Sequence, residues 1–421
     1  MPGKPEIEIS AAHPEELSQI VKMISAAFSL PLGGARDVFF SDPYLNLENK
    51  RVLRVDGEIV SCLTLIDTVC WLGRGTARLA GIAGVTTLPE QRQKGYAARL
   101  LRATLATVRE RGFALCALVP AEAAYYRRFG WEVSAFSPRY LTAPTHLPNY
   151  PEARLVRAAT PDDLPAMSRL YDVYANGRTL HCLRDARRWQ YLYQYVKQRD
   201  VFAGANGVEG YLLYEYRVAA LPEKPLETNG VVLPPTLRIL EMVAGTPAAR
   251  RGLIGHLAAQ TGMGCIETEA RLDTLRWNGL LHPTQGNAPS LASIDITPAV
   301  MARIMDFGAV VTALSANWSG LRGQFVLTLT DETLPEGGVS ILLTGHGDSV
   351  THLSLPLQDA EACPDRLTGD VRAWSQVALG HISGDDACAL GRLTATTARA
   401  FDCAAALFPR REPFLPLPDH F

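Results

Sequence analysis

The most regular hydrophobic pattern in this chain joins a strand-like run to a one-sided helix. An apolar, β-rich run from residue 80 to 87 ends at Pro89, and a polar, basic turn follows it. From Gly95 to Gly112, apolar residues recur every three to four positions, which is the spacing of a helix with one buried face. These apolar positions are Ala97, Leu101, Leu105 and Val108. The pattern therefore predicts strand, turn and helix in immediate succession, with Gly112 as the helix stop.

Strand and helix patterns alternate through the rest of the first 150 residues, in the order β-α-β-β-β-α-β-α-β. Asp56-Gly57 is a hairpin signal between two strands. The segment from Pro31 to Asn49 is long and rich in Gly, Pro and Asp, as functional loops often are, so we expect it at a substrate mouth. A helix is expected from Leu17, and the expected strands are residues 6–9, 51–55, 59–66, 77–87 and 113–119.

Two further domains are expected after a proline-rich linker at residues 147–151. A strand at 154–158 and a helix capped by Thr160 repeat the entry to the first domain. The last part of the chain has an α+β pattern. Its expected elements are a capped helix from Asp295, strands at 323–329, 339–344 and 350–355, and helices at 371–380 and 394–408. The predicted domains are residues 1–150, 151–290 and 291–421.

The composition describes a folded protein of several domains, because 421 residues exceed one ordinary core. A net charge of −2 gives no general reason to expect a nucleic acid or an anionic membrane as partner. No apolar run approaches the roughly 20 residues of a membrane span, and no signal-peptide core is evident, so we expect a cytoplasmic protein. Eight scattered cysteines fit a reducing compartment, and the nine histidines show no metal-binding spacing.

The turn before the Gly95 helix has the composition of an anion site. Unpaired backbone N–H groups and the helix dipole both favour negative charge at a helix start. Arg92 and Lys94 add positive charge, and Gly95 lets the backbone approach a ligand. A pyrophosphate is the expected occupant, although the turn by itself also fits a solvated surface turn.

The turn resembles the Arg/Gln-x-x-Gly-x-Gly/Ala loop of the GNAT acetyltransferases, which holds the pyrophosphate of acetyl-CoA. Arg92, Gly95 and Ala97 fill its defining positions. Further on, Tyr126-Arg127-Arg128-Phe129-Gly130 matches the family's Tyr-x-Arg-Phe-Gly segment, which implies that Tyr126 protonates the leaving thiolate. A phenol with an ordinary pKa of about 10 suits that role. Tyr125 is a weaker candidate, because a helix turns it roughly 100° away.

Residues 241–257 echo the first loop and suggest a second GNAT-like domain. In this second copy the segment between the proline and the glycine is one residue shorter than in the first, and Ala249 occupies the position that corresponds to Arg92. Either change would spoil a phosphate cradle, so we expect this second domain to bind no cofactor.

The whole chain resembles the Eis (enhanced intracellular survival) family. The resemblance implies tandem GNAT domains with mixed central sheets flanked by helices, a sterol-carrier-like α+β domain, and a homohexamer. It implies Tyr126 as general acid, and the carboxylate of Phe421, at the end of an apolar tail, as the base for the attacking amine. The implied acetyl-CoA contacts are Val85, Thr86, Thr87, Arg92, Gln93, Lys94, Gly95, Tyr96, Ala97, Ala98, Ala121 and Glu122.

Three positions depart from the family pattern. Ala121 lacks a hydroxyl, His420 replaces an acid, and Ala26 lies where the best-known members carry a carboxylate. The loss of the two carboxylates, at Ala26 and His420, puts a broad use of aminoglycosides in doubt more than acetyl transfer itself. The carboxylates that could compensate are Asp37, Asp42 and Asp419.

We therefore expect direct transfer of an acetyl group to a small-molecule amine, such as an aminoglycoside-like polyamine, or to a lysine ε-amine. No covalent acetyl-enzyme is needed, and Cys116 is expected to be a core residue. Two alternatives stay open: a protein-lysine acetyltransferase, and a non-catalytic binding or scaffold protein that uses the third domain.

Overall fold

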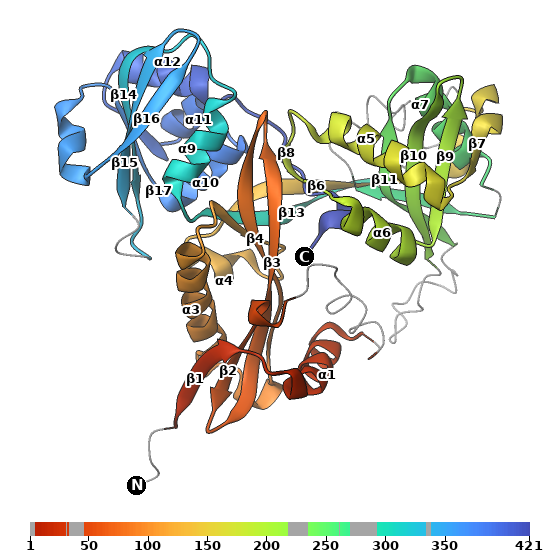
Figure 1. Cartoon of the computed structure of the whole chain (residues 1–421), viewed down its shortest axis with the longest axis horizontal. Helices are drawn as coiled ribbons and strands as arrows, with labels where there is room; N and C mark the ends of the chain where they lie inside the picture. Colours follow the sequence, from red (N-terminus) through yellow and green to blue (C-terminus); the bar gives the residue numbers. More distant parts are fainter. Residues whose placement is uncertain are drawn as a thin grey trace.

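The chain folds into three domains around a shared centre (Figure 1). Most of the loop expected at a substrate mouth, including Asp37 and Asp42, lies outside the described residues. No helix in the described part is long and apolar enough to cross a bilayer. The computed structural model describes residues 5–30, 32, 46–217, 235–260, 262–269, 293–333 and 338–421.

The first domain has the predicted order of strands and helices. Its strands follow the spatial order β1-β2-β3-β4-β5, antiparallel except for β4 beside β5. Asp56 and Gly57 take left-handed backbone angles (φ 50° and 85°) in the turn between β2 and β3, as the hairpin signal predicted. The elements are β1 (Ile7–Ala11), α1 (Leu17–Phe28), β2 (Lys50–Val55), β3 (Glu58–Leu72), β4 (Gly75–Thr87), α3 (Tyr96–Glu110), β5 (Leu115–Leu118), α4 (Ala123–Arg127) and β6 (Glu132–Thr142).

The second domain continues the same sheet through β6. From β6 the strand order is β12-β11-β10-β9-β7, while β13 lies between β5 and β6 and β8 pairs with β3. The elements are β7 (Val156–Ala158), α5 (Leu164–Ala175), β8 (Thr179–Cys182), α6 (Ala186–Tyr195), β9 (Gln198–Gly204), β10 (Gly207–Arg217), β11 (Thr236–Ala244), α7 (Pro247–Ala258), β12 (Cys265–Glu269) and β13 (Ser293–Ile304).

The third domain is a separate five-stranded sheet with helices, of the α+β kind that was predicted. Its strand order is β16-β15-β14-β17-β18. The elements are α9 (Phe307–Ser315), β14 (Arg322–Thr330), β15 (Val339–His346), β16 (Val350–Leu355), β17 (Arg366–Asp370), α10 (Val371–Leu379), α11 (Gly384–Ala389), β18 (Leu393–Ala395) and α12 (Ala398–Leu407).

One local prediction was wrong, and two elements begin later than predicted. The helix expected from Asp295 is the strand β13, because β5 and β6 pair with it on both sides, and Pro298 falls at an irregularity in that pairing. Of the strand expected at 154–158, residues 156–158 form the short β7, whereas Arg154 and Leu155 end the 3-10 turn Pro151–Leu155. The last expected helix begins only after Thr397, whose side chain accepts a hydrogen bond from Ala400 N.

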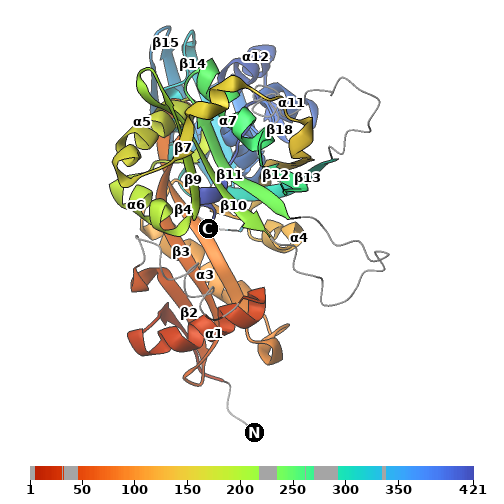
Figure 2. The same cartoon turned by 90° about the vertical axis from the view of Figure 1, so that its right-hand side faces the viewer.

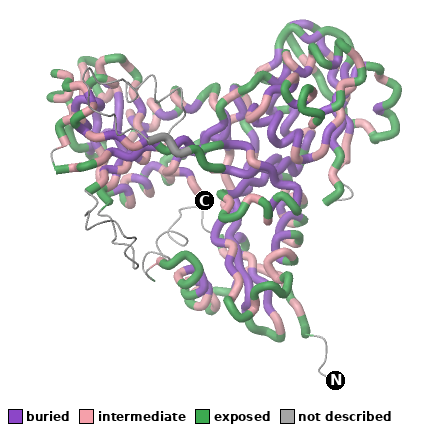
Figure 3. The backbone as a smooth tube through the Cα atoms, turned by 180° about the vertical axis from the view of Figure 1, so that it is seen from behind, coloured by how far each residue is buried: buried purple, intermediate pink, exposed green. Residues whose placement is uncertain are grey.

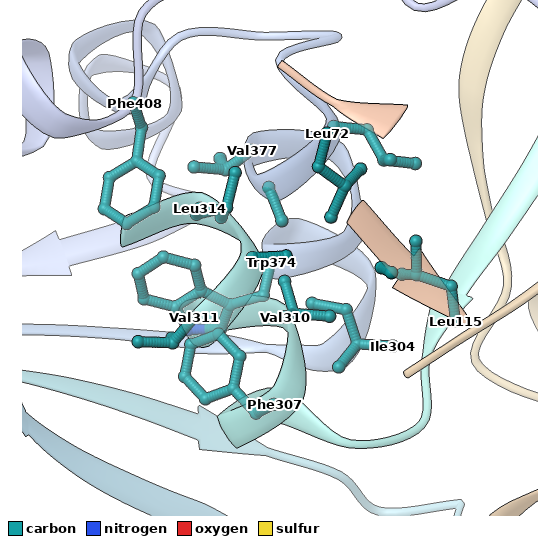
Figure 4. Packing of buried hydrophobic residues seen from close by; sticks show 14 of the residues in the cluster. Leu72, Leu115, Ile304, Phe307, Val310, Val311, Leu314, Trp374, Val377 and Phe408 are labelled. Atoms are coloured by element: carbon teal, nitrogen blue, oxygen red, sulfur yellow. The ribbon is translucent and has the colours of Figure 1, made fainter. Parts of the chain in front are cut away.

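The largest core joins the first and third domains. Leu72 and Leu115 pack in one cluster with Val310 and Trp374, and Figure 4 shows these side chains together between the domains. Buried residues, purple in Figure 3, run through the centre of the molecule where the domains meet. The sites described below are therefore held on rigid, packed elements.

Candidate active site

The turn between β4 and α3 has the geometry of an anion site. Gln93 and Gly95 take left-handed backbone angles (φ 63° and 80°), and a Cβ added to Gly95 would meet no atom within 4 Å. Arg99 N donates a helical hydrogen bond to Gly95 O at 3.0 Å, so the N–H groups of the first three helical residues precede it. Since Gly95 has no side chain to cap them, they can receive a negatively charged group.

Two exposed basic side chains flank this turn. Arg92 Nε donates to Thr87 O at 3.3 Å, which folds its guanidinium back over the end of β4. Lys94 Nζ donates to Gln91 Oε1 at 2.8 Å. Both positive charges therefore stay beside the free N–H groups, where they favour a diphosphate.

β4 and β5 separate just before the turn. Their parallel pairing ends at Ile82 and Leu118. β4 continues to Thr87, paired among the described strands only with β3, and Gly84 takes a left-handed angle (φ 61°) near a register irregularity. The side of β4 that faced β5 thus offers backbone groups to an extended ligand, as an unpaired strand edge does.

The opening leads into a cavity of about 660 Å³. Four predicted site residues line it: Val85, Ala121, Tyr126 and Phe421. The other predicted contacts are placed on the adjoining strand end and turn, and Glu122 is the residue that precedes α4. Those outside the cavity lining are Thr86, Thr87, Arg92, Gln93, Lys94, Gly95, Tyr96, Ala97, Ala98 and Glu122.

Tyr126 lies in the wall of this cavity, on the short helix α4. It is 9% exposed and packs edge-on against Tyr125 and Trp131, with ring centroids 5.2 and 6.3 Å away. Burial, with a contribution from Tyr125, raises the pKa of Tyr126 to about 12. The phenol therefore keeps its proton throughout the neutral range and can act as an acid. Tyr125 does not line the cavity.

The C-terminal tail crosses from the third domain to this cavity. Arg411 N donates to Gly380 O at 2.7 Å, and Phe414 N donates to Thr179 O of the second domain at 3.1 Å. The ring of Phe421 lies against Gly81, where an added Cβ would come within 2.5 Å of it. Figures 1 and 2 place the C-terminus at the centre of the molecule, beside β3 and α6.

Asp419 fixes the tail to the second domain. Arg184 donates to its carboxylate at 2.8 and 2.9 Å, and the hydroxyl of Tyr171 donates at 3.2 Å. Arg184 also forms a bidentate pair with Glu241, at 2.8 Å on each side, and all four residues are buried. Although burial opposes it, Arg184 holds the pKa of Asp419 below its usual range. Asp419 is thus an anchor rather than a free acid of the cavity.

The helix start of the second copy is already filled by the protein. Thr246 caps α7 by accepting a hydrogen bond from Ala249 N at 3.1 Å. Its hydroxyl donates to the carboxylate of Glu209 at 2.8 Å, so a negative charge of the chain itself occupies the helix start. This arrangement disfavours a phosphate at the second copy.

Of the other singled-out residues, Cys116 and Ala26 lie outside the cavity lining, whereas His420 belongs to it. Cys116 is fully buried, and burial raises the pKa of its thiol to about 12, which suits a core residue. Ala26 is exposed on α1. His420 lines the cavity, and its ring Nε2 lies 3.1 Å from Leu415 O. The described residues contain no group of three metal-ligating side chains.

Sequence reasoning missed the contribution of the second domain to the site. Arg184 lies 235 positions before Asp419, so no local pattern links them. The helix α6 supplies cavity residues Arg188, Tyr191 and Tyr195. Its run of aromatic residues from 189 to 195 was the only available signal.

Family models match all three domains. An acetyltransferase (GNAT) domain matches residues 8–134, a second one matches residues 181–304, and a sterol carrier protein domain matches residues 309–416. The chain is an acyltransferase of the GNAT type. This assignment favours the enzyme over the alternative of a non-catalytic scaffold.

Relatives of this acyltransferase carry similar descriptions. An uncharacterized N-acetyltransferase of Streptomyces avermitilis is 26% identical over 365 residues, covering 80% of this chain and 79% of the relative. The match to two Streptomyces griseus relatives spans only 34% of their length.

Two solved structures share the whole fold. A GCN5-related N-acetyltransferase from Anabaena variabilis has a TM-score of 0.79 at 20% identity, covering 99% of this chain and 100% of that one. Eis1 from Mycobacterium abscessus has a TM-score of 0.70 at 20% identity, with the same coverage.

Proposed function

We propose that this acyltransferase belongs to the Eis family and moves an acetyl group from acetyl-CoA to a primary amine in a ternary complex. The observation that carries the proposal is that Tyr126 and Phe421 line one cavity, at the point where β4 and β5 separate. In that arrangement an acid and a carboxylate flank the position of a thioester lying along β4.

Each group of the chain has a defined part in the reaction. The turn from Arg92 to Ala98 binds the diphosphate, and the end of β4 aligns the pantetheine arm. The Phe421 carboxylate accepts the proton of the amine as its nitrogen bonds to the acetyl carbon. Tyr126 donates its proton to the sulfur as the carbon–sulfur bond breaks. The products are an N-acetyl amide and CoA thiol, and orientation and proton transfer supply the acceleration.

The test combines binding with turnover. Calorimetry should give micromolar affinity for acetyl-CoA, and thiol release should require an added amine. Stoichiometric labelling of the protein by acetyl-CoA without acceptor would contradict direct transfer, and absence of acetyl-CoA binding would contradict the proposal as a whole. A panel that includes aminoglycosides and lysine peptides distinguishes small-molecule acceptors from protein lysines.

We also infer that the protein forms a homo-oligomer, a hexamer if it follows the Eis resemblance. A tail that must be held in a fixed place fits a stable assembly. Light scattering should give about six times the chain mass of 45.8 kDa, and a monomer mass would contradict the inference.

A further inference from the structure

The far wall of the cavity comes from the second domain and is apolar and aromatic. Tyr191 and Tyr195 of α6 pack together with ring centroids 4.5 Å apart, and Leu192 lies between them in sequence. Leu240 of β11 belongs to the same wall, and Phe28 of the first domain also lines the cavity. An acceptor that reaches Tyr126 from this side must therefore place its body against rings and aliphatic groups.

The side-chain carboxylates of the described cavity lining are already paired. Glu215 lies 2.7 Å from Arg217 and 3.7 Å from Arg238. Asp419 is held by the buried Arg184. Asp419 is therefore not left to neutralise a cation of the acceptor, and Glu215 shares its charge with two arginines.

Two cationic side chains also line the cavity. The Arg188 guanidinium donates to Pro418 O at 2.5 Å and lies 3.8 Å from Asp419, so it is part of the tail anchor. Lys197 is exposed and donates to Gln194 O at 3.1 Å. An acceptor with several ammonium groups would lose hydration here and meet positive charge, which costs free energy that no unpaired side-chain carboxylate of the described lining offsets.

We propose that the acceptor is a primary amine with a single positive charge on an apolar body of about the size of an aromatic ring. Such a body packs against Tyr191 and Tyr195, and its one nitrogen faces Phe421. This inference deepens the proposed acetyl transfer and rests on it.

An acceptor panel tests the charge argument directly. With acetyl-CoA saturating, thiol release is measured for 2-phenylethylamine, spermidine and kanamycin. We expect kcat/KM for 2-phenylethylamine to exceed the values for both polycations by about tenfold or more. Equal or higher values for the polycations would overturn the inference while leaving acetyl transfer intact. Absence of transfer to every amine would instead overturn the proposed function.

Two tyrosines of α6 provide a matched pair of variants. Tyr191→Ala removes a ring from the cavity wall, whereas Tyr193→Ala removes one from the same helix outside the lining. Tyr191→Ala should raise KM for 2-phenylethylamine by about tenfold with acetyl-CoA affinity unchanged, because the apolar contact is lost. Tyr193→Ala should leave KM within about twofold. Similar effects of the two substitutions would contradict the assigned acceptor wall.

A charge reversal gives the opposite readout. Lys197→Glu replaces an exposed ammonium of the lining by a carboxylate. It should raise kcat/KM for spermidine by about tenfold and change that for 2-phenylethylamine by less than about twofold. An unchanged value for spermidine would show that lining charge does not select the acceptor.

Discussion

At the scale of single residues, Tyr126 shows how burial sets a chemical role. The phenol sits among rings in the cavity wall, and it hydrogen-bonds to no described residue. The pKa, raised to about 12 by burial, means that the phenol keeps its proton well above neutral pH. The motif in the sequence led to the prediction of this residue as the acid, while the surrounding rings and the raised pKa could be seen only in the structure.

Substituting Tyr126→Phe should remove the acid and little else. The ring packing stays, so acetyl-CoA affinity and stability should be close to those of the wild type. We expect kcat to fall by about 100-fold or more, the usual contribution of a positioned acid. Tyr125→Phe is the control and should keep kcat within about threefold. Equal losses of kcat in the two variants would mean that Tyr126 is not the acid.

The raised pKa of Tyr126 also predicts a spectroscopic difference. Because the folded pKa lies above the ordinary value of 10, the stabilisation of the neutral phenol is complete below pH 10 and is lost as the pH rises through about 12. Tyrosinate absorbance of the wild type should therefore exceed that of Tyr126→Phe only near pH 12. A difference that develops at pH 10 would show that the phenol is not buried in solution.

The contact of Asp419 with Arg184, which anchors the tail, predicts an effect on kcat that can be distinguished from an effect on stability. Asp419→Asn leaves Arg184 with one partner fewer and releases the tail, so Phe421 should be misplaced and kcat should fall by about 100-fold. Glu241→Gln weakens the other half of the same network but leaves the tail contact in place. Both variants should lose about 3 kcal/mol of unfolding free energy, since each breaks a buried pair. A similar kcat in both would argue against positioning by Asp419.

At the scale of elements, the strand, turn and helix around Gly95 were predictable because every signal in them is local. The helical period, the left-handed glycine and the basic turn need only neighbouring residues. β13 was not predictable, because its pairing with β5 and β6 overrides a local helix-cap signal at Asp295. The same holds for α6, whose place in the cavity depends on how the first two domains are joined in one sheet.

A comparison of substitutions at the two glycines that flank α3 distinguishes an effect on ligand binding from an effect of backbone strain. Gly95 and Gly112 both have positive φ (80° and 70°), and a Cβ at either would meet no atom within 4 Å. Substitution by alanine should therefore cost each variant a similar amount, about 1 kcal/mol of unfolding free energy. Only Gly95→Ala should weaken acetyl-CoA binding, by about tenfold, because its methyl group enters the anion site. Calorimetry of both variants decides this, and equal affinities would place the diphosphate elsewhere.

At the scale of the whole molecule, the domains act as one unit because residues from each meet at the site. The first domain supplies the turn before α3 and Tyr126, the second supplies the cavity residues of α6 and Arg184, and the third carries the tail. Sequence comparison within the chain suggested three domains, yet it could not show that β6 and β13 tie the first two into one sheet.

A buried ion pair beside this junction should contribute to the stability of the whole chain. Arg303 on β13 is fully buried, donates to Asp331 at 2.5 Å, and donates to Phe129 O at 2.7 Å next to the Tyr126 segment. Asp331→Asn leaves that guanidinium without its carboxylate, so the free energy of unfolding should fall by about 3–5 kcal/mol. The exposed pair of Arg372 and Asp370 is the control, and Arg372→Gln should cost less than about 1 kcal/mol. Denaturant unfolding followed by tryptophan fluorescence measures both. Equal small losses would mean that Arg303 is solvated in solution.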